Sequence, residues 1–227
     1  MVSILVAYGS GEGQTEKVAR YVGGVLTDRG HEVTVKRVTD DPTIDVGAFD
    51  AVLVGSPVNN RRHLPAVVEF VERNREVLAS RPNGFFQLSL ASIVPLRWAQ
   101  SGAQEFVDDF VSNTGWNPDH VGRFAGAVKY SQYDPLERVL FKLVSAVTTG
   151  DTDTSRDYEY TDWEEVETFA VAFANDVEAR LTARSAEERG MSGLKRASQA
   201  VAGAVLLVGV AGVAYWVAAR RFTPAEC

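Results

Sequence analysis

The stretch Val6-Ala7-Tyr8-Gly9-Ser10-Gly11-Glu12-Gly13-Gln14-Thr15 decides the fold expected for this chain. It ends an apolar run that begins at Val2, and apolar residues then recur along one helical face, at Val18, Ala19, Val22, Val25 and Leu26. The pattern predicts a buried strand, a glycine-rich turn and a helix N-terminus. The N–H groups and dipole of such a terminus favour an anion. The glycines allow close approach of the backbone, and further donors come from Ser10, Gln14 and Thr15.

The turn lacks residues that two other kinds of phosphate-binding turn require, and their absence limits which ligand it can bind. A P-loop needs a lysine before its hydroxyl residue and a dinucleotide fingerprint needs a third glycine, but Gln14 stands at both positions. The remaining pattern, Tyr8-x-Ser10-x-x-Gly13-x-Thr15, resembles the FMN-phosphate loop of the flavodoxin family. The resemblance implies an FMN cofactor whose phosphate is bound by Ser10, Gly11, Glu12, Gly13, Gln14 and Thr15. A strand–turn–helix without a ligand is the alternative.

The rest of the first 182 residues alternates between strands and helices, which predicts an α/β fold with a doubly wound parallel sheet. We expect strands at 2–8, 32–38, 51–55, 84–90 and 124–128, and helices at 65–78 and 101–114. The half-polar strand 32–38 suits an edge position, as in the five-stranded flavodoxin order 2-1-3-4-5. A last helix is expected from Tyr160, with Thr161 and Glu164 as a capping box. A further apolar-faced helix is predicted at 135–147, within an insertion spanning 129–160.

Ligands of doubly wound sheets bind beyond the carboxyl ends of the strands, which singles out two more loops. By resemblance to flavodoxins these loops flank the isoalloxazine ring, with cofactor contacts from Ser56, Pro57, Val58, Asn59, Asn60, Ser89, Leu90 and Ala91. Surface connectors are the alternative for both loops. Three arginines lie in the same loops, at Arg61, Arg62 and Arg97, together with His63, which has a pKa near neutrality and is a candidate proton relay.

Composition excludes several other functions. The net charge of −7 argues against nucleic acid as a partner. The three histidines are too scattered for a metal site, and the acidic run 151–167 lacks the spacing of a calcium loop, so a solvated acidic face is expected there. The one cysteine, Cys227, permits no internal disulfide. The chain begins on a core strand without a signal peptide, so we expect the domain in the cytoplasm.

The C-terminal part of the chain has a different composition. Residues 197–219 are almost wholly apolar and long enough to cross a bilayer core of about 30 Å. Basic residues flank this segment, and more of them lie before it than after it, which again indicates that the domain faces the cytoplasm. The sequence therefore predicts a flavin domain at 1–182, a polar linker at 183–196, a transmembrane anchor at 197–219 and a short tail at 220–227.

Five further stretches are similar to a narrower family. They are Gly13-Gln14-Thr15, Trp116-x-Pro118-Asp119, Ala125-Gly126-Ala127-x-Lys129-Tyr130, Gly150-Asp151-Thr152-Asp153-Thr154 and Tyr160-Thr161-Asp162-Trp163-Glu164. In this order they resemble the flavodoxin-like, quinone-dependent protoporphyrinogen oxidases. The resemblance covers about residues 1–182 and implies FMN-dependent oxidation of protoporphyrinogen IX to protoporphyrin IX in haem synthesis, with electrons passed to a membrane quinone.

The chemistry of the residues is compatible with that activity, because the cofactor performs the redox step and the protein positions the substrate. Arg61, Arg62 and Arg97 are candidates to pair with the propionates of the substrate, solvated surface arginines being the alternative. Two other functions stay open: a flavodoxin-like NAD(P)H:quinone reductase, and a membrane-tethered electron carrier without a substrate of its own. Because a bare carrier does not need the insertion at 129–160, the insertion counts against the carrier. The oligomeric state does not follow from the sequence.

Overall fold

The structure is a computed structural model that describes residues 1–39, 43–89, 97–128, 158–183 and 186. Residues Met1–Val177 form one compact unit, and Glu178–Cys227 form a second, of which residues 178–183 and 186 are described and helical. The first unit is built on a six-stranded sheet with the order β2-β1-β3-β5-β6 and a short β4 paired to β3. The strands are β1 (Ser3–Tyr8), β2 (Glu32–Arg37), β3 (Ala51–Asn59), β4 (Arg62–His63), β5 (Asn83–Ser89) and β6 (His120–Ala125).

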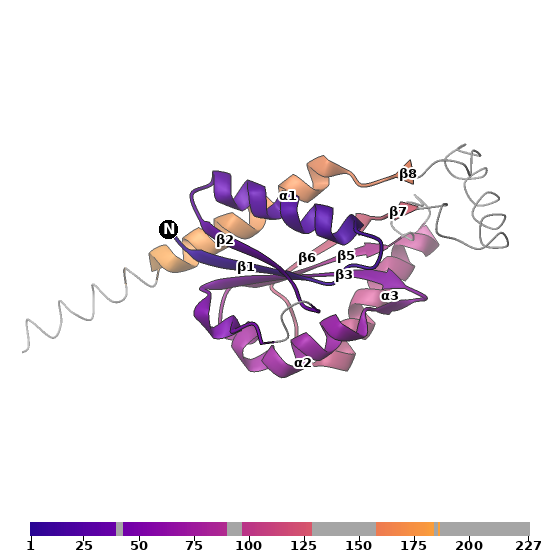
Figure 1. The fold of residues 1–227 in the computed structure, drawn as a ribbon, viewed down its shortest axis with the longest axis horizontal. Helices are drawn as coiled ribbons and strands as arrows, with labels where there is room; N and C mark the ends of the chain where they lie inside the picture. The colour runs from indigo at the N-terminus through magenta and orange to yellow at the C-terminus, as the bar shows by residue number, and fades with distance from the viewer. Residues whose placement is uncertain (40–42, 90–96, 129–157, 184–185, 187–227) are drawn as a thin grey trace, which may run out of the picture. The chain divides into compact units, whose positions relative to one another are not determined.

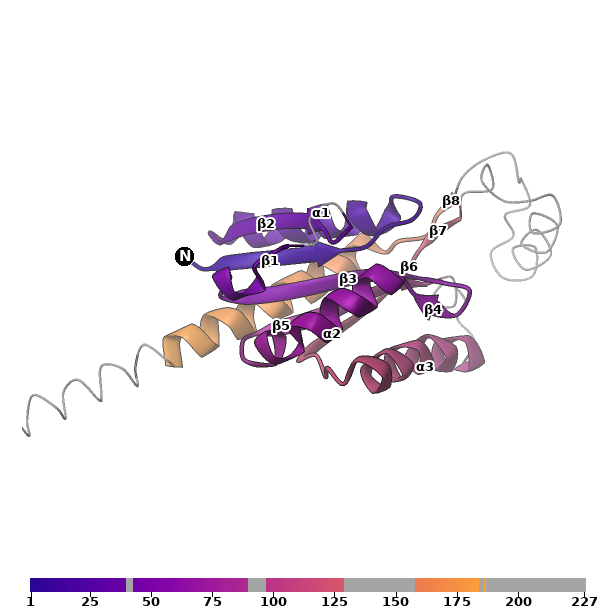
Figure 2. The same ribbon diagram turned by 60° about the horizontal axis from the view of Figure 1, so that its bottom comes forward.

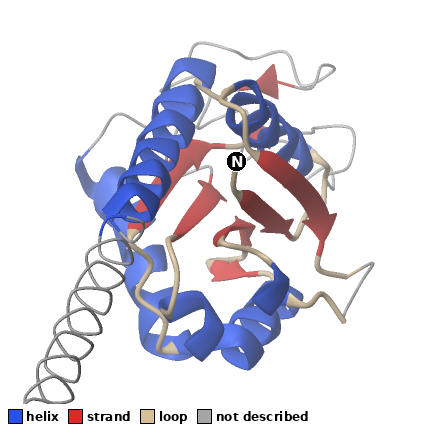
Figure 3. Cartoon of the chain, turned by 90° about the vertical axis from the view of Figure 1, so that its left-hand side faces the viewer, coloured by secondary structure: helices blue, strands red, loops and turns tan. Residues whose placement is uncertain are grey.

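Helices cover both faces of this sheet, with α1 and the last described helix on one face and α2 and α3 on the other (Figure 1). Figure 3, a view turned by 90°, shows the strands enclosed between these helices. The helices are α1 (Gln14–Asp28), α2 (Pro65–Ala79), α3 (Arg97–Thr114) and residues 163–183, with a short 3₁₀ turn η1 (Val46–Ala48). The expected doubly wound α/β architecture is therefore confirmed within the first unit.

The burial pattern explains the order of the strands. All side chains of β5 are buried and β3 is buried from Ala51 to Ser56, as expected for central parallel strands covered on both faces. In β2 every residue is at least partly accessible to solvent, which suits its place at the edge. The five long strands thus follow the predicted order 2-1-3-4-5 when numbered without β4.

The last strand of the sheet lies earlier in the sequence than we predicted. The apolar run 124–128 suggested its position, but β6 spans His120–Ala125. Only alternate residues of β6 are buried, because it is an edge strand, and its first half therefore lacks an apolar run. Ala127–Val128 instead form β7, which pairs antiparallel with β8 (Tyr158–Glu159). Figure 2 shows this ribbon at the end of the sheet where the arrows of the parallel strands point.

The segment after the third predicted strand is a hairpin and not an open loop. β3 continues four residues beyond the expected end at Gly55, and β4 pairs back onto it through Val58 with His63 and Asn59 with Arg62. The two turn residues Asn60 and Arg61 both have positive φ, at 49° and 61°. Positive φ at both central positions is the geometry of a type I′ hairpin, whose twist matches that of the flanking strands.

The predicted capping box at the last helix is wrong. The backbone N–H groups of Glu164 and Glu165 donate to the Asp162 carboxylate at 3.0 and 3.2 Å, so Asp162 caps the helix. The hydroxyl of Thr161 is engaged elsewhere, as described below. The helix predicted at 101–114 begins earlier, at Arg97. The helix predicted at 135–147 lies outside the described residues.

In the described part of the chain, no helix is both long and apolar enough to cross a membrane. The predicted anchor at 197–219, the tail at 220–227 and all but the first residue of the predicted linker at 183–196 lie outside that part. The anchor therefore stays a prediction from the sequence.

Candidate functional site

The turn between β1 and α1 provides an uncapped helix N-terminus. Gly13 is the N-cap of α1, its φ of 91° is strained for any residue with a Cβ, and no side chain caps the helix. The hydroxyl of Ser10 accepts a hydrogen bond from the Gly13 N–H at 3.0 Å and so closes the turn. Since the N–H groups of the first helical turn have no intrahelical partner and no side-chain cap, they are directed at the space where an anion would bind.

Thr15 lies in the first turn of α1 and its side chain is buried, as is that of Ser10. Glu16 follows and pairs with Arg20 at 2.8 Å across one helical turn. The pKa of Glu16 is lowered, first by its hydrogen bond with Arg20 and also by the charges of Arg20 and Arg37. This acid of the first turn is therefore balanced by cations and does not stand uncompensated beside the anion site.

Arg37 is a residue of this site that the sequence analysis missed. It ends β2, opposite Tyr8 at the end of β1, and its Nη2 donates to the carbonyl oxygen of Ser10. Its Nε is buried and has no hydrogen-bond partner among the described residues. The signal was available, because Arg37 is a charged residue at the carboxyl end of the strand next to β1.

Gln14 is buried. We predicted its side chain as a donor to the phosphate, and in the structure the side-chain amide binds Thr161. Its Nε2 donates to the Thr161 hydroxyl at 2.8 Å, and that hydroxyl donates to the carbonyl of Ala125 at 2.9 Å. The N–H of Tyr160 donates to the carbonyl of Gly126 at 3.4 Å. Gln14 therefore connects the start of α1 to the end of β6 and to the base of the ribbon formed by β7 and β8. Its backbone N–H remains part of the uncapped helix terminus.

The hairpin that follows β3 lies beside the phosphate loop. A Cβ added to Gly11 would lie 3.5 Å from Nδ2 of Asn59, and Gly9 donates from its N–H to the carbonyl of Gly55 at 2.9 Å. Ser56 is buried; its hydroxyl donates to the carbonyl of Pro57 and accepts from the N–H of Leu64 at 3.2 Å. Of the predicted residues Ser56–Asn60, Asn59 thus lies next to Gly11, and Ser56 forms hydrogen bonds within the hairpin.

His63 is buried in the core of the hairpin's base. Gln87 donates from Nε2 to the carbonyl of Ala103 at 2.7 Å, so its Oε1 is the acceptor toward His63 Nε2 at 3.0 Å. That arrangement places a hydrogen on Nε2 of His63. Burial lowers the pKa of His63, with the hydrogen bond to Gln87 acting in the opposite direction. The ring also packs 4.7 Å from that of Phe110, so the structure favours a packing role for His63.

A groove of about 780 Å³ lies between the hairpin, α2 and α3. The residues that line it include the charged Arg61, Arg62, Glu69 and Asp109 together with His63 and Phe106. The guanidinium of Arg61 lies 5.7 Å above the ring of Phe106 and 3.6 Å from the carboxylate of Glu105. The groove therefore combines an aromatic wall with charged groups of both signs.

The other predicted site residues lie at the second loop. Arg97 is the first residue of α3. Ser89 is the buried last residue of β5, and its carbonyl accepts from the N–H of Gly126 at 3.3 Å. Leu90 and Ala91 lie outside the described residues. In the described part of the chain, no three His, Cys, Asp or Glu side chains lie together as metal ligands.

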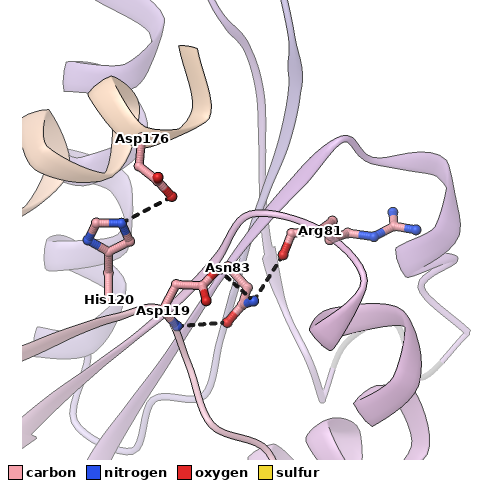
Figure 4. Close-up of polar contacts among 5 residues, drawn as sticks. All are labelled: Arg81, Asn83, Asp119, His120 and Asp176. Atoms are coloured by element: carbon pink, nitrogen blue, oxygen red, sulfur yellow. Dashed lines mark hydrogen bonds and ion pairs between the residues drawn. The ribbon is translucent and has the colours of Figure 1, made fainter. Parts of the chain in front are cut away.

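The opposite, amino edge of the sheet carries polar side chains that pair with one another (Figure 4). Asn83 donates to the carbonyl of Arg81 at 2.9 Å and to the carboxylate of Asp119 at 3.1 Å, and it accepts from the Asp119 N–H at 3.2 Å. His120 lies 3.3 Å from the carboxylate of Asp176. These contacts join β5, β6 and the last helix.

The carboxyl edge suits the phosphate of FMN on grounds that the structure supplies. The helix terminus at Gly13 is uncapped, glycines line the turn, and a buried Nε of Arg37 has no partner among the described residues. Backbone donors and a nearby cation favour the binding of a phosphate group. The residues present therefore fit the phosphate of FMN, with Ser10, Gly11, Gly13, Thr15 and Arg37 nearest to it.

Comparisons with known proteins show what the chain is similar to. The family model of the flavodoxin domain matches residues 5–155. The protoporphyrinogen IX dehydrogenase [quinone] of Escherichia coli K12 is 29% identical over 171 residues, which cover 75% of this chain and 94% of that protein. The protein of the same name from Leishmania major is 28% identical over 75% of this chain and 74% of its own length.

Among solved structures, oxidised flavodoxin 1 from Bacillus cereus is 13% identical, with a TM-score of 0.47, over 76% of this chain and 97% of that one. The resemblance to the quinone-dependent protoporphyrinogen oxidases that the motifs indicated is confirmed by the two named relatives. Since the family model spans more than half of the sequence, the chain belongs to the flavodoxin domain family.

Proposed function

We propose that this protein oxidises protoporphyrinogen IX to protoporphyrin IX with FMN as its cofactor and passes the electrons to a membrane quinone. The observation that carries the proposal is the similarity to the E. coli protoporphyrinogen IX dehydrogenase [quinone], which extends over 94% of that protein. The uncapped terminus of α1 at Gly13 adds a phosphate site of the kind that FMN needs.

A bound FMN would supply the redox chemistry, which is the acceptance of electrons from the porphyrinogen in pairs and their transfer to a quinone. The residues of this chain would bind and orient the cofactor. The turn 10–15 would hold the phosphate, and the hairpin at Ser56–Asn60 and the end of β5 at Ser89 would flank the ring.

The substrate carries two propionates on a largely apolar macrocycle of four pyrrole rings, and the groove beside the hairpin offers groups for both parts. Phe106 supplies an aromatic wall, and Arg61 and Arg62 supply cations. Because Arg61 already interacts with Glu105 and Phe106, Arg62 carries the larger share of propionate binding in this proposal. Arg97, at the start of α3, is the third candidate.

Attachment to a membrane is part of the same proposal. A quinone with an isoprenoid tail resides in the bilayer, and a tethered flavin domain would meet it there. The apolar segment 197–219 with its basic flanks supports a single-pass anchor, with the flavin domain on the cytoplasmic side.

The test compares electron donors on the purified, FMN-loaded, full-length protein without oxygen. Protoporphyrinogen IX should reduce the flavin and a soluble quinone should reoxidise it, whereas NADH and NADPH should reduce it far more slowly. Fast reduction by NADH or NADPH alone would replace the proposal with an NAD(P)H:quinone reductase. Reduction by none of the three would leave a tethered electron carrier.

The arginines are tested separately from the reaction. Arg61→Ala with Arg62→Ala should raise KM for the porphyrinogen about tenfold or more, at ~1.5–3 kcal/mol per hydrogen bond to a charged group. FMN content should not change, because the phosphate lies at the other loop. Arg73→Ala with Arg75→Ala, two exposed arginines of α2 outside the groove, is the matched control. An unchanged KM in the first pair would remove the arginines from the site.

A further inference from the structure

Arg37 is a positive charge beside the turn 10–15. A flavin phosphate brings about two negative charges near neutral pH. The nearby acid of the first helical turn, Glu16, is paired with Arg20 at 2.8 Å. The residues 10–15 themselves include no lysine or arginine. Any side-chain cation near the phosphate therefore comes from outside the turn.

Arg37 is such a cation by its position. The register of β1 with β2 places it opposite Tyr8, just before the turn, and Nη2 donates to the carbonyl of Ser10. Its Nε is buried without a hydrogen-bond partner among the described residues. A buried donor without an acceptor costs about 1–3 kcal/mol, and an anion bound beside Arg37 would offset part of that cost.

The charge of Arg37 acts on other groups of the site. It contributes to the lowered pKa of Glu16, after the larger effect of Arg20. It also opposes the rise in the pKa of Tyr8 that burial and Glu16 cause. The field of the guanidinium thus reaches both the end of β1 and the first turn of α1, which enclose the proposed phosphate site.

We propose that Arg37 is the counter-charge of the phosphate loop, and that it makes this protein select the phosphorylated flavin, FMN, over riboflavin. The inference rests on the FMN cofactor of the proposed function. Arg37 acts through its charge and by holding the carbonyl of Ser10, and no direct bond to the phosphate is required. Since an arginine stays protonated at all accessible pH values, the selectivity should weaken only where the phosphate takes up a proton, below its second pKa of about 6.

The rival explanation is that Arg37 is merely a latch for the backbone at Ser10. A latch orders the turn for any flavin, so its loss would weaken FMN and riboflavin alike. A counter-charge acts on the phosphate, which riboflavin lacks. The ratio of the two dissociation constants separates the explanations, and it needs no activity measurement.

The experiment titrates the flavin-free full-length protein, in detergent if required, with FMN and with riboflavin and follows the quenching of flavin fluorescence. In Arg37→Met the preference for FMN over riboflavin should fall about tenfold or more, with riboflavin affinity nearly unchanged. Arg37→Lys keeps the charge and should retain most of the preference. An unchanged ratio in Arg37→Met, or an equal loss for both flavins, would overturn the inference.

The matched control is Arg20→Met, which removes an arginine from the first turns of α1 whose side chain is 66% exposed and already paired. Water screens such a charge, so its loss should change the ratio much less than loss of Arg37. Thermal unfolding of each flavin-free variant verifies that it is folded. A parent protein that binds riboflavin as tightly as FMN would overturn this inference alone, whereas one that binds neither would overturn the proposed cofactor with it.

Discussion

The amino edge and the carboxyl edge of the central sheet both carry polar groups, but the hydrogen-bond partners of these groups differ. At the amino edge Asn83, Asp119, His120 and Asp176 take partners from one another, and Figure 4 shows them joined across β5, β6 and the last helix. At the carboxyl edge the terminus of α1 has no side-chain cap. In the described part of the chain, the Nε of Arg37 has no partner there either. Nε1 of Trp116, just before β6, is also a buried donor without a partner among the described residues, so one unmatched donor does not mark a binding site. The comparison teaches that the carboxyl edge is distinguished by the helix terminus without a side-chain cap, and not by polar residues as such.

The direction of the chain explains this difference. Each parallel strand leads at its carboxyl end toward a helix N-terminus, where N–H groups lack partners. Carbonyl groups of helix C-termini gather at the amino edge, and here Arg81 donates to the carbonyls of Val77 and Val46 at 3.0 and 2.9 Å. Arg81 thus donates hydrogen bonds to carbonyl groups at the amino edge, whereas the N–H groups of the α1 terminus at the carboxyl edge have no side-chain acceptor.

The largest effect is expected from Ser10→Ala with Thr15→Ala, which removes two hydroxyls from the carboxyl edge. FMN affinity should fall by several kcal/mol, at ~1.5–3 kcal/mol per charge-assisted hydrogen bond, while the flavin-free protein stays folded. Isothermal titration with FMN measures the loss. Thr27→Ala, which removes a hydroxyl from the other end of α1 where it donates to Gly23, should leave FMN affinity as it is. Unchanged affinity in the double variant would rule out this turn as the phosphate site.

A smaller effect is expected from Asn83→Ala at the amino edge, where the substitution should lower stability and leave FMN affinity unchanged. The variant leaves Asp119 with an unmet carboxylate oxygen and N–H, so the free energy of unfolding should fall by about 2–3 kcal/mol. FMN affinity of the folded protein should not change, because these bonds are satisfied within the protein. Urea unfolding and FMN titration measure the two quantities, with Asn74→Ala, a half-buried amide on α2, as the control. A selective loss of FMN affinity would break the distinction between the edges.

The smallest effect concerns His63, which follows β3 at the carboxyl edge but has its side chain buried in the core. Because burial lowers its pKa in the folded state, the unfolded chain binds more protons as pH falls below about 6.5. The stability that neutral His63 contributes is therefore complete above that pH and is lost as pH falls toward the folded-state pKa. Urea unfolding at several pH values should show this slope in the parent and not in His63→Asn. A stable variant that has lost kcat would instead identify His63 as a proton relay.

The sequence predicted those parts of the fold that depend on local periodicity. Strand and helix patterns placed α1, α2 and the first four parallel strands to within a few residues. The prediction failed where burial was partial, as in β6, whose alternating pattern began before the apolar run that we had used. It also failed for the hairpin, since residues with positive φ at Asn60 and Arg61 are signalled only weakly without glycine.

The sequence predicted one part of the candidate site and missed another. The turn 10–15 follows from hydroxyls and glycines that are neighbours in the sequence, and the structure places them at an uncapped helix terminus. Arg37 was missed because it joins the turn across 27 positions of the sequence. We predicted His63 as a candidate proton relay. In the structure its ring is buried and lies in hydrogen-bond contact with Gln87 of β5.

The sequence by itself determined the order of strands and helices, the glycine turn with its helix terminus, and hence the family. These features depend on residue spacing and on backbone preferences within a few residues. Tertiary structure alone decided which side chains meet: Gln14 takes the hydroxyl of Thr161, 147 positions away, and Arg37 takes the carbonyl of Ser10. Such partners depend on sheet register and helix packing, which bring distant segments together, and no local pattern specifies them.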